Sequence, residues 1–231
     1  MTMKLYDLAG AEDDRRFSPF CWRARLALAH KGLVCETVPW RFTEKDAIAF
    51  SGQDKVPVLV DGERVVSDSW AIALYLEDAY ADRPTLFGAP AGRGAALFVK
   101  HWTEQVAHPL LARLTVVDIV RHLHPNDVAY FRESRQRRFG MSIEEFCRDR
   151  ERVLPAFRKA LDPLRETVRG QPFIAGQAAA FADYIAFGMF QWARCISDFQ
   201  LLEGDDPVYA WRERMLDLFG GLARTSPGYP V

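Results

Sequence analysis

The chain has 231 residues, of which 49% are hydrophobic, so it is long enough to bury a substantial core as one large domain or two small ones. Its 30 Lys and Arg residues nearly balance its 31 Asp and Glu residues, and this argues against a protein that binds nucleic acid or a membrane surface through bulk charge. No apolar run of about 18 residues predicts a transmembrane helix, and the N-terminal stretch MTMKLYDLAG lacks the basic and apolar regions of a signal peptide.

The four cysteines are widely separated along the chain, at Cys21, Cys35, Cys147 and Cys195. They form no CxxC pair and no spacing typical of a zinc site. We therefore expect reduced thiols in a cytoplasmic protein, packed mainly as small hydrophobic side chains, and no bound metal.

The first third of the chain begins with strand and helix patterns in alternation. Residues 3–8 predict a strand. Ser18 and Pro19 then open a helix that ends near Gly32, a residue type that is common just after helix C-termini. Residues 34–39 predict a second strand.

The following segments predict a short helix, a hairpin and another helix. Residues 43–46 have the form of a capping box ahead of a helix that ends near Phe50. Residues 55–66 are two apolar runs around an Asp-Gly turn, which is a strong hairpin signal, and residues 67–69 open the next helix. The order β-α-β-α-β-β-α in about 80 residues predicts a compact α/β domain.

A change in composition marks the start of the second half. Residues 81–94 are rich in Pro and Gly and predict a linker, and no convincing strand pattern follows them. We expect an α/β domain at 1–84, a linker at 85–94 and an all-helical domain at 95–231. Helices are expected at residues 95–123 with a kink at Pro109, 127–139, 142–169, 181–199 and 207–223. The segment 181–199 is apolar on nearly every side and should be the buried central helix.

Ser18 is the first candidate functional residue, because it stands where dithiol thioltransferases carry a nucleophilic cysteine, in the run Ser18-Pro19-Phe20-Cys21. Ser and Pro are also simply favoured at a helix start. In functional terms, the free N–H groups and the positive dipole end of a helix stabilise a nearby thiolate. A serine hydroxyl there can donate a hydrogen bond to the sulfur anion of a ligand, but it cannot itself carry out thiol–disulfide exchange.

Two further stretches could complete a binding site. Lys55-Val56-Pro57 is either part of an edge strand or a turn whose cis proline presents the Val56 backbone to a peptide-like ligand. Asp68 and Ser69 are either a helix cap or a site that holds a carboxylate on Ser69 and an ammonium group on Asp68. Together the three features fit a ligand with a thiol, a peptide backbone and a free amino-acid end, which describes glutathione.

With these motifs the chain resembles the cytosolic glutathione S-transferase family. The thioredoxin-like half carries SPFCWRARLALAHKG, KVPVLVDG and SDSWAIALYLEDAY, and the helical half carries FADYIAFGMFQW. The run Ser-Pro-aromatic-x-Trp-Arg and residues 130–166 look most like the bacterial β-aryl-ether-cleaving transferases and their fungal relatives. The resemblance implies a thioredoxin-like N-terminal domain followed by an all-helical C-terminal domain.

The resemblance also implies that Ser18 is the catalytic residue and hydrogen-bonds the sulfur of glutathione, the co-substrate. Five residues would hold the rest of glutathione: Lys55, Val56, Pro57, Asp68 and Ser69. The backbone of Val56 would pair with the cysteinyl unit, and Asp68 and Ser69 would bind the γ-glutamyl end. Lys55 would contact the glycyl carboxylate or the backbone.

The sequence departs from the family pattern at two positions. Asp68 stands where the family usually has Glu, and its shorter side chain calls for a shifted ligand or a water. Ala180 stands where the capping segment of the family usually begins with Ser or Thr. Asp183 can still bond to the N–H of Ala180, and we expect it to be structural.

An electrophile pocket is expected between the two domains, and the 13% aromatic content fits a flat apolar substrate. Phe98, Trp102 and Val106 fall on one helical stripe, although core packing is the simpler explanation for any one of them. The residues predicted to line the pocket are Phe20, Phe98, Trp102, Val106 and Tyr130.

Residues near the expected pocket include a second candidate group, Tyr130, Phe131 and Arg135. His108 precedes Pro109, and we expect it to lie at the helix kink rather than to act as an acid or base.

The leading hypothesis is a glutathione S-transferase that adds the activated thiolate of glutathione to an apolar, aromatic electrophile. Glutathione-dependent β-aryl-ether cleavage or dehalogenation would use the same thiolate with a different leaving group, and a non-catalytic protein that binds hydrophobic ligands could share the fold. A thioltransferase that acts through Cys21 is disfavoured by Ser18, and a mixed disulfide of Cys21 with glutathione is disfavoured because the fourth position of such a run usually points inward. The resemblance further implies a homodimer in which the first domain of one subunit packs against the helical domain of the other.

Overall fold

A four-stranded sheet near the N-terminus is the frame on which the site is built. The computed structural model describes residues 3–230, and its strands are β1 (Met3–Leu8), β2 (Cys35–Trp40), β3 (Val58–Asp61) and β4 (Arg64–Ser67). The strands lie in the order β2-β1-β3-β4, with β1 parallel to β2 and antiparallel to β3. Leu5 of β1 faces Leu59 of β3 across the ladder, and both side chains are fully buried.

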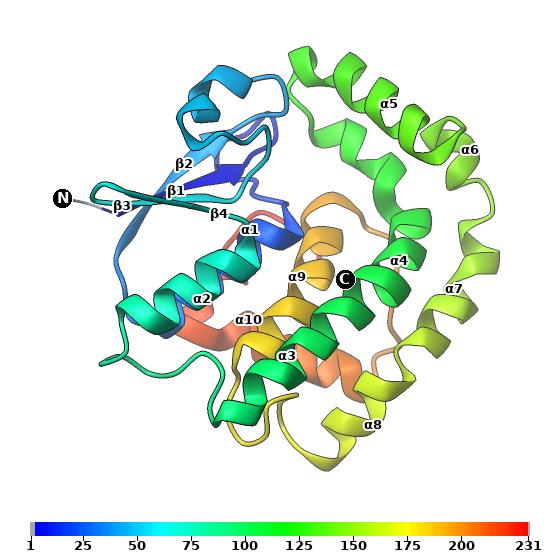
Figure 1. The fold of residues 1–231 in the computed structure, drawn as a ribbon. Helices are drawn as coiled ribbons and strands as arrows, with labels where there is room; N and C mark the ends of the chain where they lie inside the picture. Colours follow the sequence, from blue (N-terminus) through cyan, green and yellow to red (C-terminus); the bar gives the residue numbers. More distant parts are fainter. Residues whose placement is uncertain (1–2, 231) are drawn as a thin grey trace.

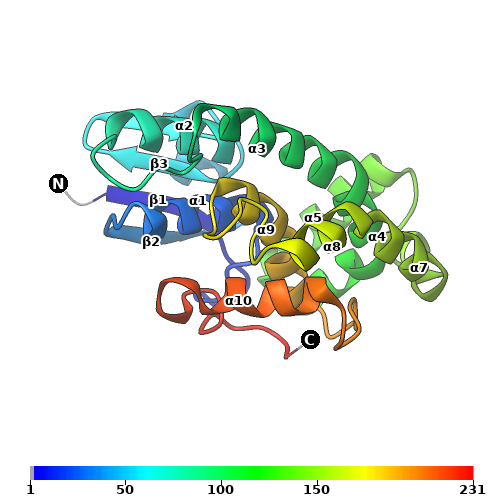
Figure 2. The ribbon, with the colours of Figure 1, turned by 90° about the horizontal axis from the view of Figure 1, so that it is seen from below.

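Two helices, α1 (Pro19–His30) and α2 (Ser69–Ala79), cover one face of this sheet (Figures 1 and 2). The Ser18 side chain caps α1, and Pro19 fits the first turn because no intrahelical partner is needed for its missing N–H. The helix ends before Gly32, whose φ of 65° is unfavourable for a residue with a Cβ. These strands and helices follow the order expected from the sequence.

The short helix expected near residue 43 forms as a 3-10 helix, η1 (Lys45–Ser51), without the predicted capping box. Glu44 precedes the helix and its side chain makes no cap bond. Thr43 instead donates its hydroxyl to Asp127 of the helical half, at 2.7 Å. A long-range contact therefore uses the group that the local pattern assigned to the cap.

The rest of the described chain is helical, which confirms the predicted fold class of a thioredoxin-like sheet domain followed by an all-helical domain (Figure 1). Its elements are α3 (Pro90–Trp102), η2 (Thr103–Ala107), α4 (His108–Thr115), η3 (Val116–His122), α5 (Pro125–Phe139), α6 (Ile143–Phe146), α7 (Arg150–Ala160), α8 (Asp162–Gly170), α9 (Phe181–Ile196) and α10 (Pro207–Gly221). Among residues 3–230, no helix combines the length and the apolar character that a membrane crossing requires.

The single helix predicted over 95–123 is a series of four segments. α3 begins at Pro90, inside the segment expected as linker, because proline is favoured in a first helical turn. The π-helical turn η2 comes just before Pro109, which has no N–H to donate to a regular α-helical ladder. After α4, the chain continues as the 3-10 helix η3.

The prediction of one helix over 142–169 is wrong, because the chain turns twice within it. α6 and α7 are separated at residues 147–149, and α7 and α8 are separated at Leu161. Pro163 in the first turn of α8 cannot continue the hydrogen-bond ladder of α7.

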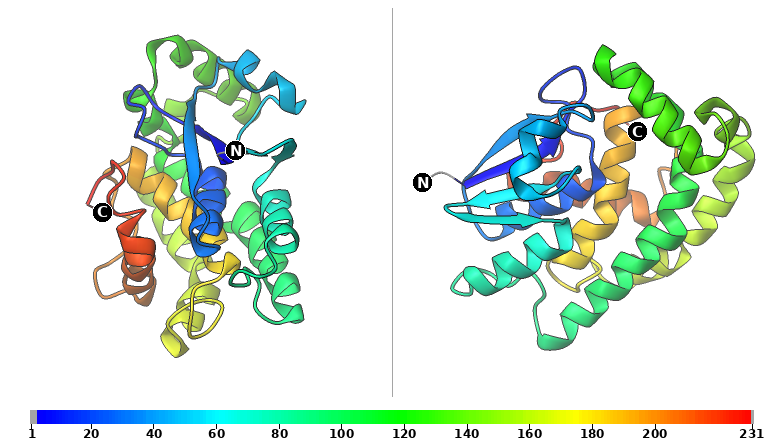
Figure 3. Two further views of the ribbon diagram at one scale, coloured as in Figure 1. Left: turned by 90° about the vertical axis from the view of Figure 1, so that its left-hand side faces the viewer. Right: turned by 45° about the horizontal axis from the view of Figure 1, so that its top comes forward.

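α9 is the buried centre of the molecule and lies between α1 and the helices of the second half (Figures 1 and 3). At Gly188 its backbone approaches α1 so closely that a Cβ would lie 2.4 Å from the carbonyl oxygen of Pro19. Only glycine permits this approach. The packing of α9 therefore fixes the position of the start of α1.

Asp183 anchors the N-terminus of α9, in agreement with the structural role expected for it. Its carboxylate accepts hydrogen bonds from the backbone N–H groups of Ile174, Ala175 and Ala180, at 2.7, 3.2 and 3.2 Å. The indole N–H of Trp211 adds a fourth bond at 3.0 Å. These bonds compensate for the side-chain cap that Ala180 cannot make.

We expect the substitution Gly188→Ala to lower the free energy of unfolding by about 1–3 kcal/mol, because the added methyl group overlaps the carbonyl of Pro19. The matched control is Gly94→Ala in α3, where nothing lies within 4 Å of an added Cβ. Helix propensity should make that control neutral or stabilising by up to ~1 kcal/mol. Urea unfolding measures both variants, and an unchanged midpoint for Gly188→Ala would contradict the close contact.

Candidate functional site

A cavity of about 620 Å³ lies between the sheet half and the helical half, within the size range of small-molecule sites. From the sheet half it is lined by Leu8, Phe17, Ser18, Pro19, Phe20, Trp40, Phe42, Lys45, Lys55 and Val56. From the helical half it is lined by Glu104, His108, Pro109, Ala112, Val116, Ile119, Tyr130, Arg135, Arg138, Phe139, Phe146 and Trp192. The cavity thus brings together five of the predicted site residues: Ser18, Phe20, Lys55, Val56 and Tyr130.

Ser18 is the N-cap of α1 and lies on the cavity wall. Its Oγ accepts a hydrogen bond from the backbone N–H of Cys21 at 3.2 Å. Because a hydroxyl can accept and donate at the same time, the O–H proton of Ser18 remains available to a molecule in the cavity. The capping role and the functional role of Ser18 are therefore compatible.

Cys21 is fully buried and is not among the residues that line the cavity. Burial and the charge of Asp7 raise the pKa of its thiol well above the ordinary value. A thiol that stays protonated is a poor nucleophile. The structure thus agrees with the interpretation of Cys21 as a packed thiol.

The loop before β3 presents unpaired backbone to the cavity. The peptide bond between Val56 and Pro57 is cis, as the functional interpretation of this stretch requires, and Val56 lines the cavity while Pro57 is buried. Within residues 3–230, neither the N–H nor the C=O of Val56 pairs with another backbone group. An extended ligand can therefore pair with both, as an added strand would.

Asp68 and Ser69 lie at the N-terminus of α2, next to this loop, rather than on the cavity lining itself. The N–H of Asp68 donates to the carbonyl of Pro57 at 3.3 Å and so ties the two segments together. Oδ1 of Asp68 accepts from the N–H groups of Trp70 and Ala71, at 2.8 and 3.1 Å. Its backbone has a φ of 77°, a strained value for a residue with a Cβ, and such strain clusters at ligand sites.

Four aromatic side chains of the helical half line the far wall of the cavity: Tyr130, Phe139, Phe146 and Trp192. Phe139 and Phe146 stack with ring centroids 4.0 Å apart. Phe42 of the sheet half packs against Tyr130 of α5 at 6.3 Å, so the aromatic surface continues across the boundary between the halves. Such a wall suits a flat apolar molecule.

Three predicted pocket residues, Phe98, Trp102 and Val106, do not line this cavity. Phe98 is 73% exposed and Val106 is 44% exposed. Glu104 and His108, which are four residues apart and share a helical face, point into the cavity instead. The sequence pattern identified the right segment but the wrong face.

His108 lines the cavity, although the sequence assigned it only to the kink. Its ring stacks on Trp192 with centroids 4.8 Å apart. Burial and the positive charges of Arg23 and Arg138 lower the pKa of His108 to about 4. The ring is therefore neutral at neutral pH and offers one donor and one acceptor. The four-residue helical spacing between Glu104 and His108 is the sequence signal that could have predicted His108 as a cavity residue.

Glu104, the one acidic residue among the described lining residues, is already paired. Its carboxylate accepts from Arg23 Nη1 at 2.6 Å and from Lys100 Nζ at 2.8 Å. Burial opposes ionisation, but the bonds from Lys100 and Arg23 hold the pKa of Glu104 below its ordinary value. Because Arg23 belongs to α1 and Glu104 to η2, the pair also links the two halves.

The chemical character of the cavity follows from these groups. A hydroxyl donor lies at a helix N-terminus, and unpaired backbone runs beside it. Four cations share the lining with the aromatic rings, Lys45 and Lys55 from the sheet half and Arg135 and Arg138 from the helical half. The arrangement suits an anionic peptide-like thiol beside a flat apolar molecule. Across residues 3–230, no group of three or more His, Cys, Asp or Glu side chains is placed to hold a metal ion.

Two family models match the sequence. The model described as "Glutathione S-transferase, N-terminal domain" matches residues 14–84. The model described as "Glutathione S-transferase, C-terminal domain" matches residues 95–210, which is about half of the chain.

Similar proteins carry the same family name. A zeta-class glutathione S-transferase of Euphorbia esula is 41% identical over 70 residues, which are 28% of this chain and 31% of that protein. Glutathione S-transferase U7 of Arabidopsis thaliana is 25% identical over 178 residues, 76% of this chain and 66% of that protein. Two further relatives of Arabidopsis thaliana are glutathione S-transferases Z1 and Z2. The match to each of them, like the match to the zeta-class relative, spans less than a third of that protein's own length.

Solved structures share the fold. Glutathione transferase GSTFuA3 of Phanerochaete chrysosporium has a TM-score of 0.77 at 23% identity, over 96% of this chain and 92% of that chain. A glutathione S-transferase of Ceriporiopsis subvermispora, solved in complex with glutathione, has a TM-score of 0.80 at 21% identity, over 98% of this chain and 99% of that chain.

The buried imidazole of His108 makes stability depend on pH. Its pKa is about 4 in the folded chain and 6.5 for a model histidine, so the unfolded chain binds the proton first as the pH falls. The stability that His108 contributes is present above pH 6.5 and is lost toward pH 4, by up to ~3 kcal/mol. We expect His108→Phe to show a shallower decline of the unfolding free energy across this window in urea titrations. An unchanged slope would contradict a buried neutral ring.

Proposed function

The chain belongs to the glutathione S-transferase family, and from this premise we propose that it activates the thiol of glutathione with Ser18 for attack on an apolar, aromatic electrophile. The observation that carries the proposal is the Ser18 hydroxyl, which caps α1 and keeps its own proton free at the wall of a partly aromatic cavity. A hydrogen-bond donor and the positive end of a helix at one point both favour a sulfur anion.

Glutathione in this proposal lies along the sheet half of the cavity. The backbone of Val56 pairs with the cysteinyl unit, and Lys55 balances the glycyl carboxylate. Ser69 and the first amides of α2 hold the γ-glutamyl carboxylate. Oδ1 of Asp68 serves the cap of α2, and Oδ2 accepts from the ammonium group of glutathione.

The proposed reaction forms one carbon–sulfur bond and breaks one bond to a leaving group. The thiol proton goes to solvent, the sulfur attacks an electrophilic carbon, and the leaving group departs with its electron pair. Residues 1–84 hold glutathione, residues 95–231 hold the electrophile and residues 85–94 connect them. A halide leaving group gives dehalogenation and an aryl oxide gives β-aryl-ether cleavage. The serine-type run at Ser18 supports both reactions as alternatives. Comparing the turnover of a haloaromatic substrate with that of a β-aryl ether distinguishes dehalogenation from ether cleavage.

Ser18→Ala should raise the pKa of the thiol of bound glutathione by about 1–2 units, since the thiolate loses a hydrogen bond worth roughly 1.4–2.7 kcal/mol. The measurement is a pH titration of the ultraviolet absorbance of the thiolate at saturating glutathione. Turnover of chlorodinitrobenzene at neutral pH should fall in parallel, by about tenfold or more.

The matched control for this titration is Ser142→Ala. Ser142 Oγ accepts from the N–H of Glu145 at 3.2 Å, a cap bond like that of Ser18, but it is not among the residues that line the cavity. Both variants should lose about 1 kcal/mol of stability, whereas only Ser18→Ala should change the thiol pKa. An ordinary thiol pKa in the wild-type complex would favour a non-catalytic ligand-binding protein, and a pKa unaffected by Ser18→Ala would remove Ser18 from the mechanism.

We further propose a homodimer in which the sheet half of one subunit packs against α3 and η2 of the other. Leu97, Phe98 and Val106 on these helices are 40%, 73% and 44% exposed. In the sheet half, Phe50 and Val65 are 54% and 38% exposed. Exposed apolar side chains of this size can form an interaction surface when two subunits bring them together.

Phe98→Asp should raise the dissociation constant of the dimer by at least about tenfold, because it places a charge in an apolar interface. Sedimentation equilibrium measures the constant. Val34→Asp is the control, since Val34 is 89% exposed but precedes β2, at the sheet edge opposite β4. Equal dissociation constants for wild type and Phe98→Asp would assign the interface to another surface.

A further inference from the structure

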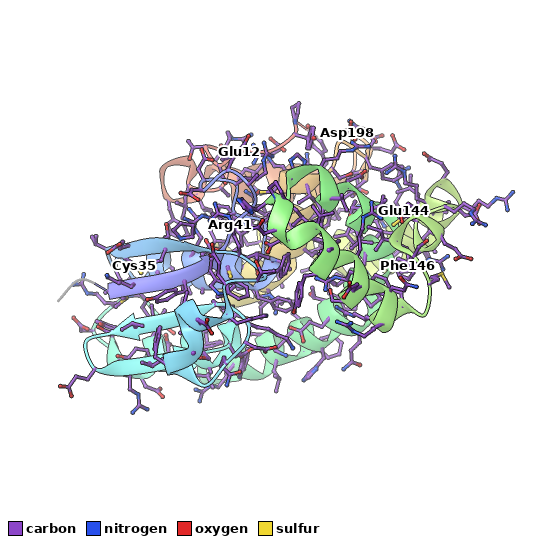
Figure 4. The ribbon with its side chains drawn as sticks, turned by 90° about the horizontal axis from the view of Figure 1, so that it is seen from above. Glu12, Cys35, Arg41, Glu144, Phe146 and Asp198 are labelled. Atoms are coloured by element: carbon purple, nitrogen blue, oxygen red, sulfur yellow. The ribbon has the colours of Figure 1, made fainter. Side chains whose placement is uncertain are left out.

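Two arginines on the cavity side of α5, Arg135 and Arg138, form no ion pair with any carboxylate in residues 3–230. The other two arginines of this helix are paired. Arg132 binds Glu144, which Figure 4 labels at α6, and Arg137 lies 3.9 Å from a glutamate one turn earlier. The uncompensated charge of α5 is therefore confined to the face that lines the cavity.

Arg135 is held in place by the protein itself. Its guanidinium lies over the rings of Phe131 and Phe42, at 4.5 and 5.6 Å from the centroids. Phe131 is fully buried, and the backbone N–H of Phe42 donates to Asp127 at 3.0 Å, so the ring of Phe131 and the backbone of Phe42 are held in place. Burial and the neighbouring Arg138 lower the pKa of Arg135 to about 10, so it remains charged at neutral pH.

The other described groups of the cavity leave this charge uncompensated. Glu104 already receives hydrogen bonds from Arg23 and Lys100. His108 is neutral at neutral pH because of its low pKa. An anion in the helical half of the cavity therefore has to come from the ligand.

Glutathione does not provide that anion in the proposed binding mode. Lys45 and Lys55 lie in the sheet half, where Lys45 donates to the backbone carbonyl of Asp54. In the proposed mode Lys55 balances the glycyl carboxylate, and the ammonium group of Lys45 already lies over the rings of Trp40 and Tyr130. Arg135 and Arg138 are left facing the second substrate.

We propose that the second substrate is an aromatic electrophile with an anionic oxygen group, such as a carboxylate, and that Arg135 binds this group. The inference rests on the proposed function and names the substrate class of the same site. The planar guanidinium matches the two oxygens of a carboxylate with paired N–H donors. Arg138, exposed at the rim of the cavity, attracts the same group, while Phe146 and Trp192 contact the aromatic ring.

A binding experiment tests this charge recognition without turnover. Naphthoate and its methyl ester are titrated by calorimetry into the protein, with and without saturating S-methylglutathione. Naphthoate should bind about tenfold more tightly than the ester, and Arg135→Gln should remove the difference. Arg137→Gln is the matched control, because Arg137 lies on the same helix but is paired and outside the lining, and it should keep the preference.

A kinetic experiment then tests the substrate class. The probes are chlorodinitrobenzoate and neutral chlorodinitrobenzene, which lose the same chloride, and each kcat/KM is divided by the uncatalysed rate. This normalised kcat/KM for the carboxylated probe, divided by that for the neutral probe, should fall about ten- to hundredfold in Arg135→Gln. Arg135→Lys keeps the charge but loses the planar fork, and should give an intermediate ratio.

The outcomes separate this inference from the proposed function. Equal affinity of the wild type for naphthoate and its ester, or a preference that survives Arg135→Gln, would overturn the anionic substrate. No binding of S-methylglutathione together with no turnover of chlorodinitrobenzene would overturn the proposed function instead. In that case the naphthoate titration without S-methylglutathione still decides whether Arg135 recognises an anion.

Discussion

The contact between Gly188 of α9 and the carbonyl of Pro19 determines where the first turn of α1 lies. The cap residue Ser18 immediately precedes this contact, so its hydroxyl is positioned by packing between the two halves of the chain. The ion pair of Arg23 with Glu104 is a second link from the same part of α1 to the helical half. Both walls of the cavity are therefore held by interactions that begin within two turns of Ser18.

One residue type at the start of α1 separates two kinds of sulfur chemistry. A cysteine in place of Ser18 would have a thiolate stabilised by the helix end, whereas a serine offers only a hydroxyl proton. The cysteine of the same run, Cys21, is buried in the core, and burial raises the pKa of its thiol. Glutathione would supply the only reactive sulfur in the proposed mechanism, and the protein would supply the electrostatic environment.

Both sides of the cavity carry apolar rings and polar groups, but the polar groups differ in kind between the sides. The sheet half presents the backbone of Val56 to the cavity, and the helix cap at Asp68 lies next to it; both suit a peptide with charged ends. The helical half presents stacked aromatic rings and the guanidinium of Arg135. In a site of low polarity, a fixed cation without a counter-charge is costly unless a ligand compensates it. This constraint connects the geometry of α5 to the chemistry of the second substrate.

Local patterns were sufficient for the order of strands and helices and the cap at Ser18, because caps, turns and side-chain periodicity act over a few residues. For the bond before Pro57 the local pattern left an edge strand and a cis turn open, and the structure has the cis bond. Local patterns failed where a distant contact decided the outcome. Asp127 accepts a hydrogen bond from the hydroxyl of Thr43, and His108, just after the π-helical turn, lines the cavity whereas Phe98 does not. Which face of a helix borders a cavity depends on what packs against its other faces, and that information lies far away in the chain.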